Sequence, residues 1–187
     1  MTANSVPKTV GVLLAAGLSR RFGPENKLTF AWQGQPLMSY AADALVGAGC
    51  ESLAAVVSDP DVAALLPAGF TAIALPTGLP MASSFVAAVD HAVALGGQRL
   101  LICLGDMPGI SGARLRELLA MPGSAACTCE GARMPPMVLE AADFTRARAS
   151  AKGDRGARVF LQSLSPQQLL PLEAFEAVDI DLRPDSN

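Results

Sequence analysis

Histidine and paired cysteines are scarce in this chain of 187 residues, which contains one histidine and four cysteines. With His91 alone, a Ser-His-Asp, Cys-His or Glu-x-x-His arrangement is hard to assemble, and we expect His91 to be a surface or satisfied core residue of a helix. No Cys-x-x-Cys pair occurs, and one histidine cannot complete a zinc set. We therefore expect all four cysteines to be small buried hydrophobic residues: Cys50, Cys103, Cys127 and Cys129. The alternative is a metal or redox role for Cys127 and Cys129, which would share one face of a strand.

An excess of positive charge and long apolar runs are also missing. The formal net charge is −3, and no basic tail or face is evident, so we expect no nucleic-acid partner, and any cationic site must be local. Gly, Asp, Pro or a charged residue interrupts the apolar runs within the length of a strand, which argues against a membrane span. The N-terminus lacks an apolar segment before a cleavage site. We therefore expect a cytoplasmic protein.

Apolar runs of strand type alternate with alanine-rich stretches of helical spacing. This pattern is typical of an α/β fold in which helices pack on both faces of a mainly parallel sheet. The chain has the length of one such domain, residues 1–187. We predict strands at 9–15, 52–57, 70–75 and 99–104, and helices at 36–47, 62–66, 82–95 and 111–121. Segments 125–129 and 137–139 are expected to form a small antiparallel addition before two last helices, near 142–149 and 156–164.

A glycine-bounded loop with three cations follows the first predicted strand. Gly17 and Gly23 allow positive φ and a close approach of the backbone to a ligand, so that N–H groups can face phosphate oxygens. Arg20, Arg21 and Lys27 add positive charge. The loop matches neither the dinucleotide-binding fingerprint nor the P-loop. We interpret it as a triphosphate-binding loop; the alternative is a strand-to-helix turn with solvated basic residues.

An aspartate follows the most apolar strand. In open α/β sheets ligands bind at the carboxyl ends of the strands, and Asp106 comes directly after such an end in Gly105-Asp-Met-Pro108. Mg²⁺ takes carboxylate and phosphate oxygens together, so Asp106 is a candidate Mg²⁺ ligand. The alternative is an aspartate that caps a turn before Pro108.

The loop Leu14-Ala-Ala-Gly-Leu-Ser-Arg-Arg-Phe-Gly-Pro-Glu-Asn-Lys-Leu28 resembles the signature Leu-Ala-Ala-Gly-x-Ser-x-Arg-x-Gly-x-x-Asn-Lys-Leu of the molybdopterin nucleotidyltransferase-like family, in its cytidylyltransferase branch. The motif at Asp106 resembles the metal motif of that family. The resemblance implies a three-layer Rossmann-like nucleotidyltransferase fold and catalytic roles for Arg21, Lys27 and Asp106. It also implies a nucleotide site formed by Leu14, Ala15, Ala16, Gly17, Arg21, Lys27, Ser84 and Gly105.

Three other segments resemble the family less closely. Ser84 takes the position of a serine that opens a long helix and helps to read the base, although Ser83 or Ser84 could serve as a helix cap only. Asp181 matches the second metal ligand, with Asp179 as the fallback and a solvated acidic tail as the alternative. Arg155 and Arg158 lie near an expected helix start and match acceptor-binding positions; the alternative is a surface helix capped by Asp154.

The family resemblance implies transfer of CMP from CTP to a terminal phosphate of molybdopterin, with Mg²⁺ and release of pyrophosphate. The choice of CTP over GTP rests on Ala16, and a molybdoenzyme partner is possible within this family. Met134 and Pro135 depart from the family pattern in a segment expected to be an acceptor-lining loop. This departure keeps a sugar-phosphate or alditol-phosphate nucleotidyltransferase open. A non-catalytic nucleotide-binding chaperone of a molybdoenzyme is a second alternative, favoured if Asp181 is displaced from the metal. An NAD-dependent dehydrogenase is the alternative at the level of the fold, but the sequence lacks the glycine fingerprint of dinucleotide binding.

Overall fold

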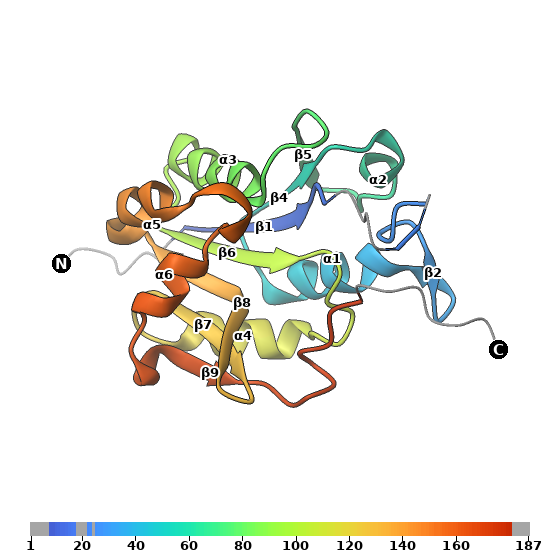
Figure 1. Ribbon diagram of the computed structural model, residues 1–187. Coiled ribbons are helices and arrows are strands. Elements are labelled where there is room, and N and C mark those ends of the chain that lie inside the picture. The colour runs from blue at the N-terminus through green and yellow to red at the C-terminus, as the bar shows by residue number, and fades with distance from the viewer. Residues whose placement is uncertain (1–7, 18–21, 24, 181–187) are drawn as a thin grey trace.

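The computed structural model describes residues 8–17, 22–23 and 25–180. Within them, a seven-stranded sheet has the order β5-β4-β1-β6-β8-β7-β9 (Figure 1). Four neighbouring strands are parallel: β1 (Thr9–Ala15), β4 (Ser52–Val57), β5 (Phe70–Ala74) and β6 (Arg99–Leu104). Strand β8 (Ala132–Glu140) runs antiparallel to β6 and to β7 (Ala125–Cys129), and β9 (Leu169–Pro171) is parallel to β7.

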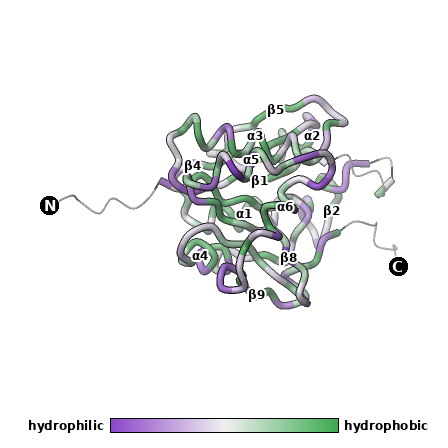
Figure 2. The backbone as a smooth tube through the Cα atoms, turned by 60° about the vertical axis from the view of Figure 1, so that its left-hand side comes forward, coloured by the Kyte–Doolittle hydropathy of each residue, from purple (hydrophilic) through white to green (hydrophobic). Residues whose placement is uncertain are grey.

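Helices cover both faces of the sheet. Side chains alternate along β1, so that Leu13 and Ala15 pack on one face while Val10 and Val12 pack on the other. The first face is covered by α1 (Leu37–Ala48), α2 (Pro60–Ala64) and α4 (Gly112–Ala120). The second is covered by α3 (Met81–Ala94), α5 (Phe144–Ser150) and α6 (Arg158–Ser163). The predicted three-layer α/β fold is confirmed, and Figure 2 shows its hydrophobic residues concentrated along the central elements.

Short or proline-containing elements differ from the prediction. A hairpin of β2 (Ala31–Trp32) and β3 (Gln35–Pro36) was not predicted, nor was β9, because two or three residues carry no periodic pattern. Strand β8 is longer than predicted, since Pro135 and Pro136 lie within it and proline usually argues against a strand. The segment of Met134 and Pro135, expected to be a loop, is therefore part of the sheet. Short 3₁₀ helices cover Ala141–Asp143, Gly153–Arg155 and Pro166–Gln168.

The cysteines are less uniform than expected. Cys103 and Cys127 are buried, whereas Cys50 and Cys129 are half-buried. Burial raises the pKa of Cys50 and of Cys127 to about 12, so both thiols stay protonated at neutral pH. A protonated thiol is a poor nucleophile and metal ligand, which leaves Cys127 the role of a small hydrophobic residue. His91 is half-buried on α3.

No helix in the described part of the chain combines the length and apolar character needed to cross a membrane.

The contact between α1 and α4 depends on a glycine pair. A Cβ atom built on Gly112 would lie 3.0 Å from the Gly47 Cα and 3.1 Å from the Ala44 carbonyl oxygen, which are backbone atoms. A Cβ atom on Gly47 would meet only the Gly112 Cα, at 3.4 Å. The two helices therefore tolerate a methyl group on one side of the contact only.

We predict that Gly112→Ala lowers the free energy of unfolding by about 1–3 kcal/mol, because the helices must separate. Gly47→Ala is the matched control, and it should be neutral or stabilising, since alanine favours a helix interior. Thermal melts measure both variants, and a destabilisation of about 1 kcal/mol should lower the Tm by roughly 2–4 °C in a chain of this size. Equal stability of the two variants would contradict this account.

Candidate active site

The candidate site lies where β1, β4 and β6 end. Parallel strands bring their carboxyl ends to one edge, and here the edge carries Gly17, Ser58 and Asp106. The Gly105 N–H donates to the Leu14 carbonyl oxygen at 3.0 Å, which prolongs the pairing of β6 with β1. A Cβ atom on Gly105 would lie 3.2 Å from Leu28 Cδ2. The glycine therefore lets the loop after β1 pack against the end of β6, beside Asp106.

Lys27 lies between two carboxylates. Its Nζ is 2.6 Å from Asp106 Oδ2 and 3.5 Å from Asp179 Oδ1. The Lys27 and Asp106 side chains are 11% and 18% exposed, so this charge contact is only partly screened by solvent. The Ile180 N–H also donates to the Asp106 carbonyl oxygen at 3.2 Å. The structure thus brings together the two halves of the chain that were predicted to form a phosphate and metal site.

The carboxylates offer oxygen ligands to a hard cation. Asp106 Oδ1 is buried and accepts no hydrogen bond within the described residues, whereas buried polar atoms are normally paired. Asp179, the fallback to Asp181, shares Lys27 with Asp106. These two carboxylates fit the donor set of Mg²⁺ or Mn²⁺, which take oxygen ligands from protein and phosphate together. The described residues contain no group of three acidic, histidine or cysteine ligands. Arg21 and Asp181 lie outside the described residues.

A cavity of about 220 Å³ opens beside this edge. It is lined by Gly17, Gly23, Glu25, Asn26, Ser58, Asp59, Pro60 and Thr77. Asn26 shapes its wall, because its Nδ2 donates to Asp59 Oδ2 at 2.8 Å and its Oδ1 accepts from the Leu28 N–H at 3.0 Å. The Asn26 bond and the N–H of Asp61 hold the pKa of Asp59 below its usual value. Asp59 also caps α2, so Asn26 ties the glycine-bounded loop to the start of that helix.

The residues proposed to bind the nucleotide differ in whether they line the cavity. Gly17 lines it. The Ala16 carbonyl oxygen accepts from Ser58 Oγ at 3.1 Å, while its methyl group packs against the hydrophobic cluster on the α3 face. Leu14 and Ala15 belong to β1. Ser84 is half-buried in the first turns of α3 and is not among the residues that line the cavity.

The suggestion that Ser83 or Ser84 caps α3 is wrong. Pro80 is the N-cap residue, since the fixed φ of proline suits a helix start.

Ser58 and Thr77 line the cavity but were not predicted as site residues. Single hydroxyl residues after a strand carry no distinctive spacing. The signal available was the position of Ser58 directly after the second parallel strand, at the edge where ligands bind.

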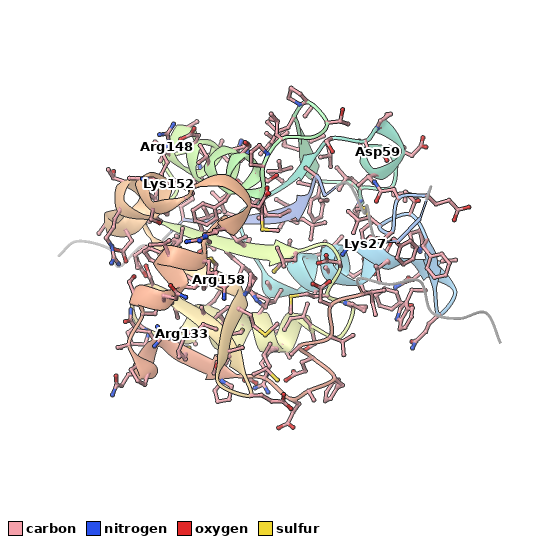
Figure 3. All side chains as sticks on the ribbon, viewed as in Figure 1. Lys27, Asp59, Arg133, Arg148, Lys152 and Arg158 are labelled. Carbon is pink, nitrogen blue, oxygen red and sulfur yellow. The ribbon has the colours of Figure 1, made fainter. Side chains whose placement is uncertain are left out.

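The two arginines proposed to bind the acceptor lie in and just after the turn that packs on the start of α3. Arg155 ends the 3₁₀ helix, and Arg158 is the first residue of α6; both are exposed. A Cβ atom on Gly156 would lie 3.1 Å from Met81 Cγ, so this turn packs on the first residue of α3. Figure 3 shows Arg158 and Lys152 to the left of Lys27. Ala157, not Asp154, is the N-cap residue of α6, and no side chain of the described residues bonds to that cap.

Residues 11–169 match the family model described as MobA-like NTP transferase domain. The chain belongs to this family. It is therefore a nucleotidyltransferase of the MobA-like type, and the expected family resemblance is confirmed.

Two curated relatives cover nearly the whole chain. Nicotine blue oxidoreductase of Paenarthrobacter nicotinovorans is 28% identical over 87% of this chain and 85% of its own length. The purine catabolism protein PucB of Bacillus subtilis is 29% identical over 94% of this chain and 91% of its own.

Solved structures share the fold of this MobA-like chain. Rv0371c of Mycobacterium tuberculosis H37Rv has a TM-score of 0.79 at 22% identity, covering 95% of this chain and 94% of its own. Its complex with manganese gives 0.67 at 19% identity, covering 88% and 87%. A nucleotidyl transferase of Methanothermobacter thermautotroptrophicus gives 0.77 at 20% identity, covering 94% and 92%.

The position of Lys27 generates a prediction about metal affinity. Its ammonium group competes with a divalent cation for the Asp106 oxygens, so Lys27→Met should strengthen Mn²⁺ binding by the nucleotide-free protein about tenfold or more. A contact between unit charges is worth about 4 kcal/mol at 4 Å and an effective dielectric constant of 20, above the ~1.4 kcal/mol that corresponds to tenfold. Titration of free Mn²⁺ by electron paramagnetic resonance measures this affinity. Lys152→Met, at an exposed lysine, is the control and should leave it unchanged; equal affinities in all three proteins would refute the prediction.

Proposed function

We propose that this MobA-like nucleotidyltransferase transfers CMP from CTP to the terminal phosphate of molybdopterin and releases pyrophosphate. The contact of Lys27 with Asp106 and Asp179, beside the cavity of the glycine-bounded loop, carries this proposal. This contact would supply a phosphate-binding cation and two metal-binding carboxylates at the edge of the sheet where ligands bind in open α/β folds. The decisive experiment incubates the pure protein with each labelled nucleoside triphosphate and Mg²⁺, with and without molybdopterin, and follows pyrophosphate release.

The nucleotide would lie along the edge of the sheet. The cavity between Gly17, Asn26 and Thr77 has room for part of a nucleoside, and the triphosphate would extend toward Lys27. Lys27, and Arg21 by family resemblance, would hold the phosphates. Asp106 and Asp179 would hold Mg²⁺, with Asp181 as a further proposed ligand, and the bound ion would neutralise charge on the phosphate oxygens. The manganese complex of Rv0371c supports a divalent ion in a protein of this fold.

The acceptor needs positioning more than activation. A phosphate monoester has a second pKa of about 6 and is largely ionised at neutral pH, so its attacking oxygen requires no general base. The reaction then depends on alignment and charge neutralisation. This agrees with a chain that has one histidine, on α3. Arg155 and Arg158 are proposed to bind the acceptor phosphate.

Acceptor identity distinguishes the proposal from its nearest alternative. A sugar-phosphate or alditol-phosphate nucleotidyltransferase would use the same nucleotide residues, and Met134 and Pro135 depart from the family on the acceptor side. A panel of molybdopterin, sugar phosphates and alditol phosphates separates the two. Binding of CTP without transfer to any of them would favour the non-catalytic chaperone of a molybdoenzyme.

The name of one relative favours a second candidate function. Nicotine blue oxidoreductase matches 87% of this chain, which makes an oxidoreductase activity worth testing. The glycine fingerprint of dinucleotide binding is missing from the sequence. NADH consumption in the presence of a dye acceptor, without any nucleoside triphosphate, would identify this activity.

We predict that Asp106→Asn lowers the rate of Mg²⁺-dependent transfer by about 10²–10³-fold or more, while the protein still binds nucleotide without metal. Asparagine keeps the size of the side chain but removes the charge that holds the cation. The hydrogen bond from the Ile180 N–H is kept, because it is accepted by the backbone carbonyl oxygen of residue 106. Metal-titrated activity and nucleotide binding in a chelator measure the two effects. Asp90→Asn, at an exposed carboxylate of α3, is the control with normal activity; near-normal turnover of Asp106→Asn would assign Asp106 a structural role.

We also predict that CTP is preferred over GTP by tens to hundreds-fold. Steric exclusion of the larger purine base and one hydrogen bond made only to cytosine are each worth about 1–3 kcal/mol of selectivity. Ala16→Gly should erode this preference more than it lowers turnover, because the Ala16 carbonyl oxygen holds Ser58 at the cavity wall and glycine loosens that backbone. Competition of equal CTP and GTP measures the ratio. A preference of the wild-type protein for GTP would reject transfer of CMP but would not contradict the assignment as a nucleotidyltransferase.

A further inference from the structure

The segment that carries Asp179 crosses from the far edge of the sheet to the candidate site. This segment, residues 172–180, is called the strap below. It begins where the Leu172 N–H donates to the Thr128 carbonyl oxygen at 2.8 Å, next to β9. It ends where Ile180 is buried with Phe22 and Leu37. Between these ends the strap forms no helix or strand, so its path depends on the contacts that its residues make with neighbouring elements.

An ion pair between Arg114 and the buried Glu176 holds the middle of the strap. Arg114 Nε donates to Glu176 Oε1 at 3.0 Å, and Arg114 Nη2 donates to Glu176 Oε2 at 2.9 Å. Glu176 Oε2 also accepts from the Glu173 N–H at 2.9 Å, which closes a turn of the strap on the same carboxylate. The Glu176 side chain is only 9% exposed. Two-pronged, charge-assisted bonds of this kind define direction as well as distance.

A backbone contact sets the position of the strap against the Asp106 loop. A Cβ atom on Gly109 would lie 2.0 Å from the Phe175 carbonyl oxygen, so the two backbones touch. Gly109 lies three residues after Asp106, and Arg114 lies on α4, which follows the same loop. The loop that presents Asp106 and the helix that grips Glu176 are therefore one continuous unit.

We propose that Arg114 and Glu176 are positioning residues, whose ion pair holds the strap against the Asp106 loop so that Asp179 and Asp106 form one cation site. The proposal rests on the metal role given to these carboxylates under the proposed function. Asp179 is itself 42% exposed, and its distance to Lys27 Nζ is 3.5 Å against 2.6 Å for Asp106. The Glu176 ion pair, three residues earlier in the strap, and the buried Ile180 that follows hold the backbone on either side of Asp179. Loss of the ion pair would let the strap move away from the Asp106 loop, so that the carboxylates of Asp106 and Asp179 would no longer face one cation.

The test is a double-substitution cycle read by Mn²⁺ binding to the nucleotide-free protein, measured by electron paramagnetic resonance. Glu176→Gln should weaken Mn²⁺ binding about tenfold, within the range typical for groups that orient metal ligands. Asp179→Asn should weaken it by at least as much. If Glu176 acts through Asp179, the double variant should bind no more weakly than Asp179→Asn alone. Additive losses would overturn the proposal, as would unchanged Mn²⁺ affinity in a folded Glu176→Gln protein.

The matched control is Asp90→Asn, which removes the acid of another two-pronged arginine pair, formed with Arg148 at 2.7 and 3.2 Å on the exposed surface. Its Mn²⁺ affinity should equal that of the wild-type protein. Where Glu176→Gln fails to fold, Arg114→Lys keeps the charge but loses the fork, and it should weaken Mn²⁺ binding to a smaller extent, again without effect in the Asp179→Asn background.

This cycle needs no nucleotide and no transfer reaction. A non-additive cycle in a protein that transfers nothing would retain the positioning role and reject the proposed function. Additive losses in a protein with normal CTP-dependent transfer would reject only the positioning role.

Discussion

The site depends on the charge balance around Lys27. Asp106 and Asp179 come from distant parts of the sequence and approach the same ammonium group. Two carboxylates this close repel one another unless a cation lies between them, and the cost grows as the site is screened from water. Lys27, itself 8% exposed, supplies that cation in the protein without ligand. The loop after β1, the end of β6 and the strap are thus held at one point by a charge contact that a metal and a triphosphate can also satisfy.

The central fold could be predicted because its strands are buried on both faces. β1, β4 and β6 read as continuous apolar runs, and their predicted bounds agree with the structure. Glycines and capping residues marked helix ends, as at Gly49 after α1 and Ser111 before α4. The strands at the antiparallel end were harder, since β8 contains two prolines and β9 has three residues. Local pattern is informative only where an element is long enough to repeat it.

The same limit applies to the site. Asp106 was predicted because it follows the end of a buried strand, and Lys27 because it closes a loop of unusual composition that begins after another buried strand. The meeting of Asp179 with Asp106 could not be read from spacing, because the strap has no regular structure and reaches the site through Glu176, Gly109 and Ile180. Ser58 and Thr77 were missed since a single hydroxyl carries no pattern. The roles of Arg21 and Asp181 remain predictions from resemblance.

The residues proposed to bind the nucleotide and the cation come from other parts of the chain than those proposed to line the acceptor. The proposed nucleotide site lies on short loops that extend the parallel strands, with Asn26 joining the loop after β1 to the start of α2. The proposed cation site combines one such loop with the strap, which the Arg114–Glu176 ion pair and the Gly109–Phe175 contact hold against that loop. Met134 and Pro135, which depart from the family pattern in the segment proposed to line the acceptor, lie in β8, on the opposite side of β6 from β1. A change of acceptor through β8 would therefore leave the proposed nucleotide-binding residues and the charge balance around Lys27 unaltered.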